Sequence, residues 1–330
     1  MFTASINMIR VLLTRVKTRD NIFLDGIALL PRRRADTILV WIHGLGSNFA
    51  HGQILTKELS GQCAKNNIAY LKFNTRGHDI VNRDGTDKNA LYGAGFEKFE
   101  ECVFDIRAMI ARARKLGCKR IVLAGHSTGA NKALYYLYKT KDRSVKGLVL
   151  LGPVNDGAAG RKKFGPAGLA RGVKLAEKLS RKNPHTLMPL SYGVFSAKRF
   201  LSMFRPGETE DIFPYLDPQA EWQALQNIRA PLAIVFGSRD EYLDPVRGNA
   251  SNGVNRPAQR IIDIFRAHAP LAKSPAPHLS WTRHHTYDML SGKGAGFTGI
   301  IIKNADHGFK GKEKALAKTI INWIAHMKKI

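Results

Sequence analysis

Two features are scarce in this 330-residue chain, and each scarcity excludes a class of protein. Its only cysteines are Cys63, Cys102 and Cys118, and none of them stands in a CxxC pair. This excludes a disulfide-rich scaffold and fits a reducing compartment. No apolar run approaches the roughly 18 residues that a transmembrane helix needs, so we expect no membrane span. With 44% apolar residues, the chain can nevertheless form a core of ordinary size.

Acidic residues are scarce as well, because 26 Asp and Glu stand against 52 Lys and Arg, for a formal net charge of +26. A surface with this excess attracts polyanions such as nucleic acid or anionic membrane. The basic residues are spread along the whole chain and are not gathered in one arm, which is more typical of a solvated surface than of a binding stripe. We therefore expect only weak, non-specific polyanion binding.

The N-terminal stretch MFTASINMIRVLLTRVKTRD has no acid before Asp20 and faintly resembles a mitochondrial presequence. However, it continues directly into NIFLDGIALLP, so that the two stretches are typical of two strands that turn near Asp20 and Asn21. Arg10 and Arg15 interrupt its apolar residues, which makes a secretory signal unconvincing. We expect a cytoplasmic protein.

Short apolar runs alternate with segments of helical periodicity along most of the chain. This alternation is the pattern of crossover units, and it predicts a mostly parallel, doubly wound sheet with helices on both faces, an α/β fold. Strands are expected at 37–44, 68–74, 120–127, 146–154, 231–237 and 296–305, and helices at 51–66, 95–117, 130–140 and 314–329.

The alternation stops near Asn155 and resumes near residue 226, which suggests an insertion. We expect residues 1–154 to form the first half of the core and residues 226–330 the second half. Residues 155–225 are rich in Lys, Arg and Pro and are interpreted as a cap inserted over the carboxyl edge of the sheet. Within the second half, residues 244–295 are expected to form a looser loop excursion.

The strongest chemical signal is Gly125-His126-Ser127-Thr128-Gly129, which fits the G-x-S-x-G nucleophile elbow. A buried strand is expected before it and a helix after it, as the motif requires. Glycines flank the serine because side chains two positions away on either side would collide with neighbouring segments. We expect Ser127 to be a nucleophile that a histidine activates by removing its proton.

The partners of such a serine follow it in the order acid, then histidine, each after a strand of the sheet. Asp240 follows the strand at 231–237, and His307 follows the strand at 296–305. We expect His307 to act as general base and then as general acid, and Asp240 to fix its tautomer. Glu241 and Asp244 compete for the acid role, and Asp306 stands beside the histidine.

Acyl transfer also needs backbone donors that stabilise an oxyanion. One donor should be the N–H of Thr128, directly after the nucleophile. The other should come from the loop that follows the strand at 37–44, where His43-Gly44-Leu45-Gly46 stands, with Leu45 as the favoured donor.

On these motifs the chain resembles an α/β-hydrolase, and more narrowly the serine hydrolases related to fungal siderophore (fusarinine-type) esterases. The narrower resemblance depends on TRDNIFLDGIALLP, WIHGLGSNF, GHSTGANKALYYL and SRDEYLDP, and NADHGF completes the coverage of both halves of the sheet. The family implies an α/β-hydrolase fold and the hydrolysis of ester or amide bonds without a cofactor.

We therefore predict a serine esterase that cleaves a small-molecule carboxylic ester through an acyl-enzyme, with no metal ion, since neither HExxH nor a paired CxxC is present. A thioesterase, amidase or acyltransferase would use the same triad. An alternative of another class is a catalytically silent basic module that binds nucleic acid or membrane. The motifs do not specify the acyl group, the alcohol, the substrate-binding residues or the oligomeric state.

Overall fold

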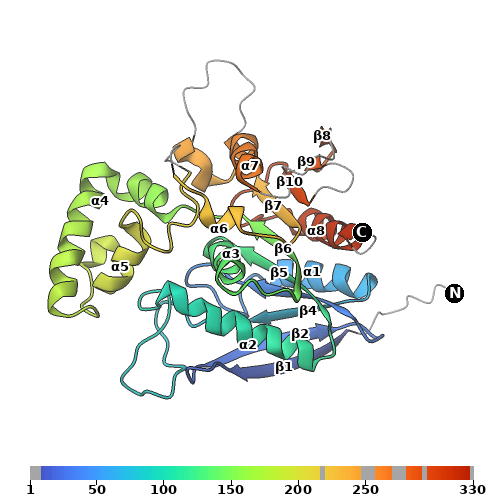
Figure 1. The fold of residues 1–330 in the computed structure, drawn as a ribbon, viewed down its shortest axis with the longest axis horizontal. Coiled ribbons are helices and arrows are strands. Elements are labelled where there is room, and N and C mark those ends of the chain that lie inside the picture. The colour runs from blue at the N-terminus through green and yellow to red at the C-terminus, as the bar shows by residue number, and fades with distance from the viewer. Residues whose placement is uncertain (1–8, 216–219, 247–256, 270–279, 292–295, 328–330) are drawn as a thin grey trace.

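A computed structural model describes residues 9–215, 220–246, 257–269, 280–291 and 296–327. These residues form one ten-stranded sheet in the order β1-β2-β4-β3-β5-β6-β7-β10-β9-β8 (Figure 1). Its strands are β1 (Arg10–Lys17), β2 (Phe23–Leu30), β3 (Thr37–Ile42), β4 (Ile68–Phe73), β5 (Arg120–His126), β6 (Val145–Leu151), β7 (Leu232–Gly237), β8 (Ser280–Arg283), β9 (Tyr287–Ser291) and β10 (Phe297–Ile302).

The central six strands, from β4 to β10 in that order, are parallel. Antiparallel strands extend both edges, β2 and β1 on one side and β9 and β8 on the other. The parallel strands β3, β4, β7 and β10 are buried along their whole length, which explains their almost continuous apolar sequences. The expected mostly parallel, doubly wound sheet is thereby confirmed.

Helices cover both faces of the sheet. The core helices are α1 (Gln53–Lys65), α2 (Cys102–Lys115), α3 (Thr128–Thr140), α7 (Pro257–His268) and α8 (Glu313–Met327). α1 and α8 share one hydrophobic cluster with the sheet, and α2, α3 and α7 share the cluster on its other face. No helix among the described residues is both long enough and apolar enough to cross a bilayer.

Between β6 and β7 the chain forms α4 (Asp156–Lys182), α5 (Ala197–Phe204) and the short α6 (Gln223–Gln226). α4 and α5 make a lobe beside the sheet in Figure 1, with a hydrophobic cluster of their own that includes Leu169, Phe200 and Phe204. α4 is kinked at Gly165, where φ is 70° directly before Pro166. We refer to α4 and α5 together as the cap.

The segment 244–295 contains more regular structure than a loose excursion. Helix α7 buries Ile261, Ile262 and Phe265 against the sheet, and β8 and β9 form a hairpin that extends the sheet beyond β10. The strands were missed because both are short and polar, as edge strands commonly are. Residues 247–256, 270–279 and 292–295 of the predicted excursion lie outside the described residues, as do the first eight residues of the predicted hairpin.

Candidate active site

Ser127 lies on a tight turn between β5 and α3 at the carboxyl edge of the sheet. Its backbone has φ 57° and ψ −129°, a conformation that non-glycine residues rarely adopt. Its N–H donates to the carbonyl of Leu151, at the end of the neighbouring strand β6, over 2.9 Å. Its side chain is partly exposed, while the following Thr128, the first residue of α3, is buried.

The two glycines of the motif allow β5 and α3 to approach closely. A Cβ on Gly125 would lie 2.1 Å from the carbonyl oxygen of Gly129, and a Cβ on Gly129 would lie 2.3 Å from that of Ile42. Real Cβ atoms do not come this close to backbone, so neither position accepts a side chain unless the turn opens. The expected reason for both glycines is confirmed.

Asp240 and His307 lie in contact at the same edge of the sheet, after β7 and β10. His307 Nδ1 is 3.0 Å from Asp240 Oδ2 and 3.1 Å from Oδ1, and only 2% of Asp240 is exposed. A carboxylate only accepts, so Nδ1 carries the proton and donates. Nε2 is therefore left as a proton acceptor, and it has no hydrogen-bond partner among the described residues.

The end of β6 contacts both the Ser127 turn and His307, although no hydrogen bond joins the serine to His307 Nε2 in the described residues. The Leu151 carbonyl accepts from the Ser127 N–H, and the next residue, Gly152, lies against the histidine. A Cβ on Gly152, whose φ is +48°, would lie 2.9 Å from His307 Cε1. Glycine at this position therefore leaves the imidazole room to lie beside the serine turn.

His126, directly before the serine, contacts both the backbone and the ring of His307. Its Nε2 donates to the His307 carbonyl over 2.8 Å, and the two rings lie 4.9 Å apart. Burial lowers the pKa of His126 to about 4, so that it stays neutral and keeps a single donor on Nε2. It holds the backbone of His307 and does not compete for the proton of the serine.

The competing acids take other positions. Glu241 is exposed, and its Oε2 accepts from the backbone N–H of His307 over 3.0 Å. Asp306 Oδ1 accepts from the backbone N–H of Lys310 over 2.9 Å, as turn aspartates do. The side chain of Asp244 lies outside the described residues. Of the described acids, Asp240 is the one that contacts the imidazole.

The loop after β3 lies against the serine. A Cβ on Gly44 would be 3.0 Å from Ser127 Cβ and 3.5 Å from its Oγ, so this glycine lets the loop approach the nucleophile. Leu45 follows, and its side chain packs on the hydrophobic cluster of the cap. We call residues 43–47 the oxyanion loop, after the role expected for Leu45.

His43 fixes the conformation of this loop from inside the core. Its Nε2 accepts from the Thr75 N–H over 2.9 Å, and its Nδ1 donates to the Gly44 carbonyl over 2.8 Å. Burial, reinforced by the nearby Lys132, lowers the pKa of His43 to about 3. Both ring nitrogens form hydrogen bonds, and protonation of Nε2 would remove the acceptor of the Thr75 N–H.

This buried neutral histidine gives a testable dependence of stability on pH. The unfolded chain binds a proton at His43 near pH 6.5, whereas the folded chain excludes it until about pH 3. The stabilising contribution is therefore complete above pH 6.5 and declines as the pH falls, by about 1.4 kcal/mol per pH unit. Urea unfolding at several pH values between about 7 and 5 should give a shallower decline for His43→Gln than for the unmodified protein.

The exposed His284 provides the control, because His284→Gln should leave the decline of stability unchanged. An identical decline in the unmodified protein and in His43→Gln would contradict the assignment of His43 as a buried neutral group.

A cavity of about 460 Å³ opens between the oxyanion loop and the cap. It touches Leu45 on one side and Tyr242 on the other, and the ring of Tyr242 lies 4.4 Å from that of His307. Its lining combines an apolar wall, made by side chains of the oxyanion loop and of residues 195–204, with charged side chains. The apolar set is Leu45, Phe195, Met203 and Phe204, and the charged set is Asp156, Lys162, Lys163 and Glu241.

A larger cavity of about 990 Å³ borders the same end of α4 and shares Met203 and Phe204 with the first. It is lined by residues such as Arg161, Leu169 and Arg205, and by none that contact Ser127 or His307. Of these two cavities, the smaller is the one whose lining residues contact His307, through Glu241 and Tyr242. Among the described residues, no three His, Cys, Asp or Glu side chains are arranged to hold a metal ion.

The sheet order, the strained serine after β5 and the cap between β6 and β7 define the α/β-hydrolase fold. Solved structures of this class are similar over almost their entire length. The siderophore hydrolase EstB from Aspergillus fumigatus has 16% identity and a TM-score of 0.63, with 98% of this chain and 99% of EstB covered. A soluble variant of monoglyceride lipase from Saccharomyces cerevisiae has 13% identity and a TM-score of 0.59, with 99% of each chain covered.

An esterase from Pyrococcus furiosus has 16% identity and a TM-score of 0.55, with 99% of this chain and 94% of the esterase covered. At these identities the likeness establishes the fold. Residues 90–257 match the model of a family described as "Protein of unknown function (DUF1749)", and the chain belongs to this family. No curated protein matches the chain in sequence.

Sequence reasoning missed the roles of two residues around His307. Glu241 anchors its backbone, and Tyr242 packs on its ring. Both directly follow Asp240, so their position in the chain is the signal that could have identified them. Arg76, which follows β4, is fully buried and pairs with Asp105 and Asp20.

Proposed function

We propose that the protein is a serine hydrolase that cleaves a carboxylic ester through an acyl-enzyme, with Ser127 as nucleophile, His307 as base and Asp240 as the acid that orients it. The observation that carries the proposal is the contact between His307 Nδ1 and Asp240 at the edge of the sheet where Ser127 turns. The contact presents Nε2 as the acceptor for the serine proton. The similarity to an esterase, a siderophore hydrolase and a lipase supports ester hydrolysis as the activity.

In the first half-reaction, Ser127 Oγ attacks the carbonyl carbon of the ester while its proton moves to His307 Nε2. The carbonyl oxygen becomes an oxyanion, for which the N–H groups of Leu45 and Thr128 are the proposed donors. Collapse of this intermediate breaks the C–O bond, and the alcohol leaves with the proton held by His307.

In the second half-reaction, His307 takes a proton from water as the water attacks the acyl-enzyme. The carboxylic acid departs and Ser127 recovers its proton. Asp240 remains ionised throughout and stabilises the imidazolium that forms in each half. No step requires a group from outside the chain except the ester and water.

The same chemistry would serve a thioesterase, an amidase or an acyltransferase, which differ in leaving group or acceptor. A panel of esters, thioesters, amides and lactones offered to the purified protein separates them. We expect esters to be hydrolysed fastest and water to be a competent acceptor. Turnover of thioesters or amides without ester turnover would contradict the ester assignment.

The apolar wall of the smaller cavity leads us to propose that it receives the acyl group. Phe195 lines this wall, so Phe195→Ala should enlarge the acyl site and move the optimum toward longer acyl chains. One methylene in an apolar pocket changes relative rates by about 10-fold to 200-fold, which sets the size of the expected shift. The measurement is kcat/KM across a series of esters of one alcohol with rising acyl length.

Leu201→Ala is the matched control, since Leu201 is buried in the cap cluster but does not line the cavity. It should reduce stability and leave the chain-length profile unchanged. A profile that Phe195→Ala does not move would rule out this wall as the acyl site.

The net charge of +26 supports a second, weaker property, namely non-specific attraction of polyanions. Each phosphate that the surface neutralises releases a counterion, so binding of duplex DNA should weaken steeply with added salt and show no sequence preference. Hydrolysis of a neutral ester should be almost independent of salt over the same series. Sequence-selective DNA binding at physiological salt without any ester turnover would instead favour a catalytically silent binding module.

A further inference from the structure

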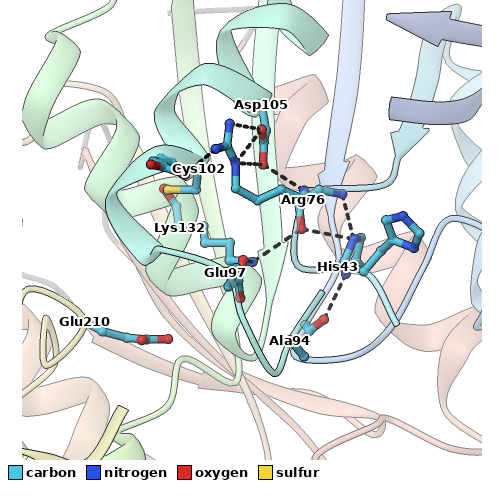
Figure 2. A network of polar contacts seen from close by, with 12 residues as sticks. His43, Arg76, Ala94, Glu97, Cys102, Asp105, Lys132 and Glu210 are labelled. Atoms are coloured by element: carbon cyan, nitrogen blue, oxygen red, sulfur yellow. Dashed lines mark hydrogen bonds and ion pairs between the residues drawn. The ribbon is translucent and has the colours of Figure 1, made fainter. Parts of the chain in front are cut away.

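Four charged side chains are fully buried where the cap meets the core, namely Glu97, Lys132, Arg199 and Glu210. Lys132 on α3 donates to Glu97 Oε2 over 2.7 Å. Arg199 on α5 of the cap donates to Glu97 Oε1 over 3.3 Å and to Glu210 Oε1 over 2.9 Å, with a further short contact to Glu210 Oε2. Glu97 thus joins a cation of the core to a cation of the cap. Figure 2 shows Glu97 and Lys132 of this network, with His43 nearby.

The core end of this network reaches the oxyanion loop. Lys132 Nζ lies 3.3 Å from Thr75 Oγ1, and the Thr75 backbone N–H donates to His43 Nε2. His43 Nδ1 in turn donates to the Gly44 carbonyl. A continuous series of polar contacts therefore runs from Arg199 in the cap to the backbone of the loop that lies against Ser127.

The two positive and two negative charges of the network pair with one another, and Gly77 leaves space for the Glu97 carboxylate. Two cations face two carboxylates, and burial, which would raise the pKa of Glu97, is outweighed by Lys132 and Arg199, so that its pKa falls below the ordinary value. A Cβ on Gly77 would lie 2.1 Å from Glu97 Oε2, so the absence of a side chain there makes room for the carboxylate. Both oxygens of Glu97 are held, one from each side of the boundary between cap and core.

Apolar contacts would attach the cap without the desolvation cost of four charges, and buried ion pairs are generally weak contributors to stability. What buried, fully paired charges do provide is a fixed geometry, because leaving one unpaired is costly. The two ends of this network are consistent with that role, since one is the cap and the other is the loop next to the nucleophile.

We propose that Arg199 and Glu97 are positioning residues that fix the oxyanion loop from the cap, so that the seating of the cap sets the geometry of the proposed donor at Leu45. Neither side chain contacts the reacting atoms, and both act through Lys132, Thr75 and His43. The catalytic consequence depends on the proposed function, whereas the mechanical link between cap and loop does not.

The mechanical link is tested by hydrogen exchange of the backbone amides in peptides that cover residues 43–49. Arg199→Lys keeps the charge but cannot hold two carboxylates in one plane. We expect several-fold faster exchange in these peptides, with exchange in the core strand β7 unchanged. Faster exchange in both segments would indicate general destabilisation, and unchanged exchange in residues 43–49 would mean that no link exists. Either result would overturn the proposal.

Arg205→Lys is the matched control. Arg205 directly follows α5 and pairs with Glu208, but its side chain is 45% exposed and outside the network. In Arg205→Lys, the backbone amides of residues 43–49 should exchange as fast as in the unmodified protein. If Arg199→Lys does not fold, Thr75→Val carries the same test, because it removes one hydroxyl of the pathway and keeps all four charges.

The catalytic consequence is tested with a small acetate ester, so that contacts of a long acyl chain do not contribute to the rate. A misplaced donor should lower kcat of Arg199→Lys by about 10-fold to 100-fold with KM within about twofold. In a cycle with Thr75→Val, the double variant should lose no more than the worse single variant, since both interrupt one pathway. An unchanged kcat in Arg199→Lys would refute the shared pathway. So would a double variant whose loss in kcat equals the product of the two single losses. Absence of turnover in the unmodified protein would refute the proposed function alone.

Discussion

Ser127→Ala is expected to lower kcat for ester hydrolysis by about 10⁴-fold to 10⁶-fold, the usual cost of removing one member of such a triad. The variant deletes a single oxygen from a partly exposed side chain and should leave the fold intact. The measurement combines turnover of the best ester in the panel with circular dichroism and thermal unfolding. Loss of turnover together with loss of structure would not count in favour of the nucleophile.

Ser144→Ala is a useful control, since it removes a serine hydroxyl in the turn before β6, at the amino end of the parallel strands and away from the elbow. Its turnover should stay close to that of the unmodified protein. A folded Ser127→Ala protein with full turnover would show that another residue attacks the ester.

Asp240→Asn is expected to lower kcat by about 10⁴-fold. An amide in place of the carboxylate can donate to Nδ1, which favours the tautomer with the proton on Nε2. His307 would then hold its proton on the nitrogen that has to accept one from the serine. The change is nearly isosteric, so KM and stability should respond far less than kcat.

Asp306→Asn and Asp244→Asn are the comparisons for this experiment. Asp306 caps the turn at Lys310 through an oxygen that the amide retains, and turnover should remain within a few-fold. Asp244 is the competitor that the sequence alone leaves open. Equal losses in Asp240→Asn and Asp244→Asn would overturn the assignment of the acid.

The elbow and the order of its partners could be predicted because their signals are local. A buried strand, a glycine-flanked serine and a helix follow one another from Arg120 to Thr140. Asp240 and His307 each come within a few residues of the end of an apolar strand. The close approach that excludes side chains at Gly125 and Gly129 is a consequence of this local geometry. Parallel strands then bring their carboxyl ends to one edge without further information.

The network between cap and core could not be predicted in the same way. Glu97 and Arg199 are 102 positions apart, and nothing in the residues around them marks them as partners. Lys132 is the fifth residue of the helix α3, and a lysine on a helix is ordinarily solvated. Only the seating of the cap on the core makes these charges internal, and that seating depends on tertiary packing.

Labelling with a fluorophosphonate tests the central claim most directly, because it reports the activated nucleophile whatever the natural ester is. The probe forms a bond between a serine oxygen and phosphorus as fluoride leaves, and peptide mapping by mass spectrometry locates the adduct. The account predicts one adduct, on Ser127, that is absent in Ser127→Ala and forms far more slowly in His307→Gln. A folded protein that takes up no probe, or takes it up at another residue, would contradict the account.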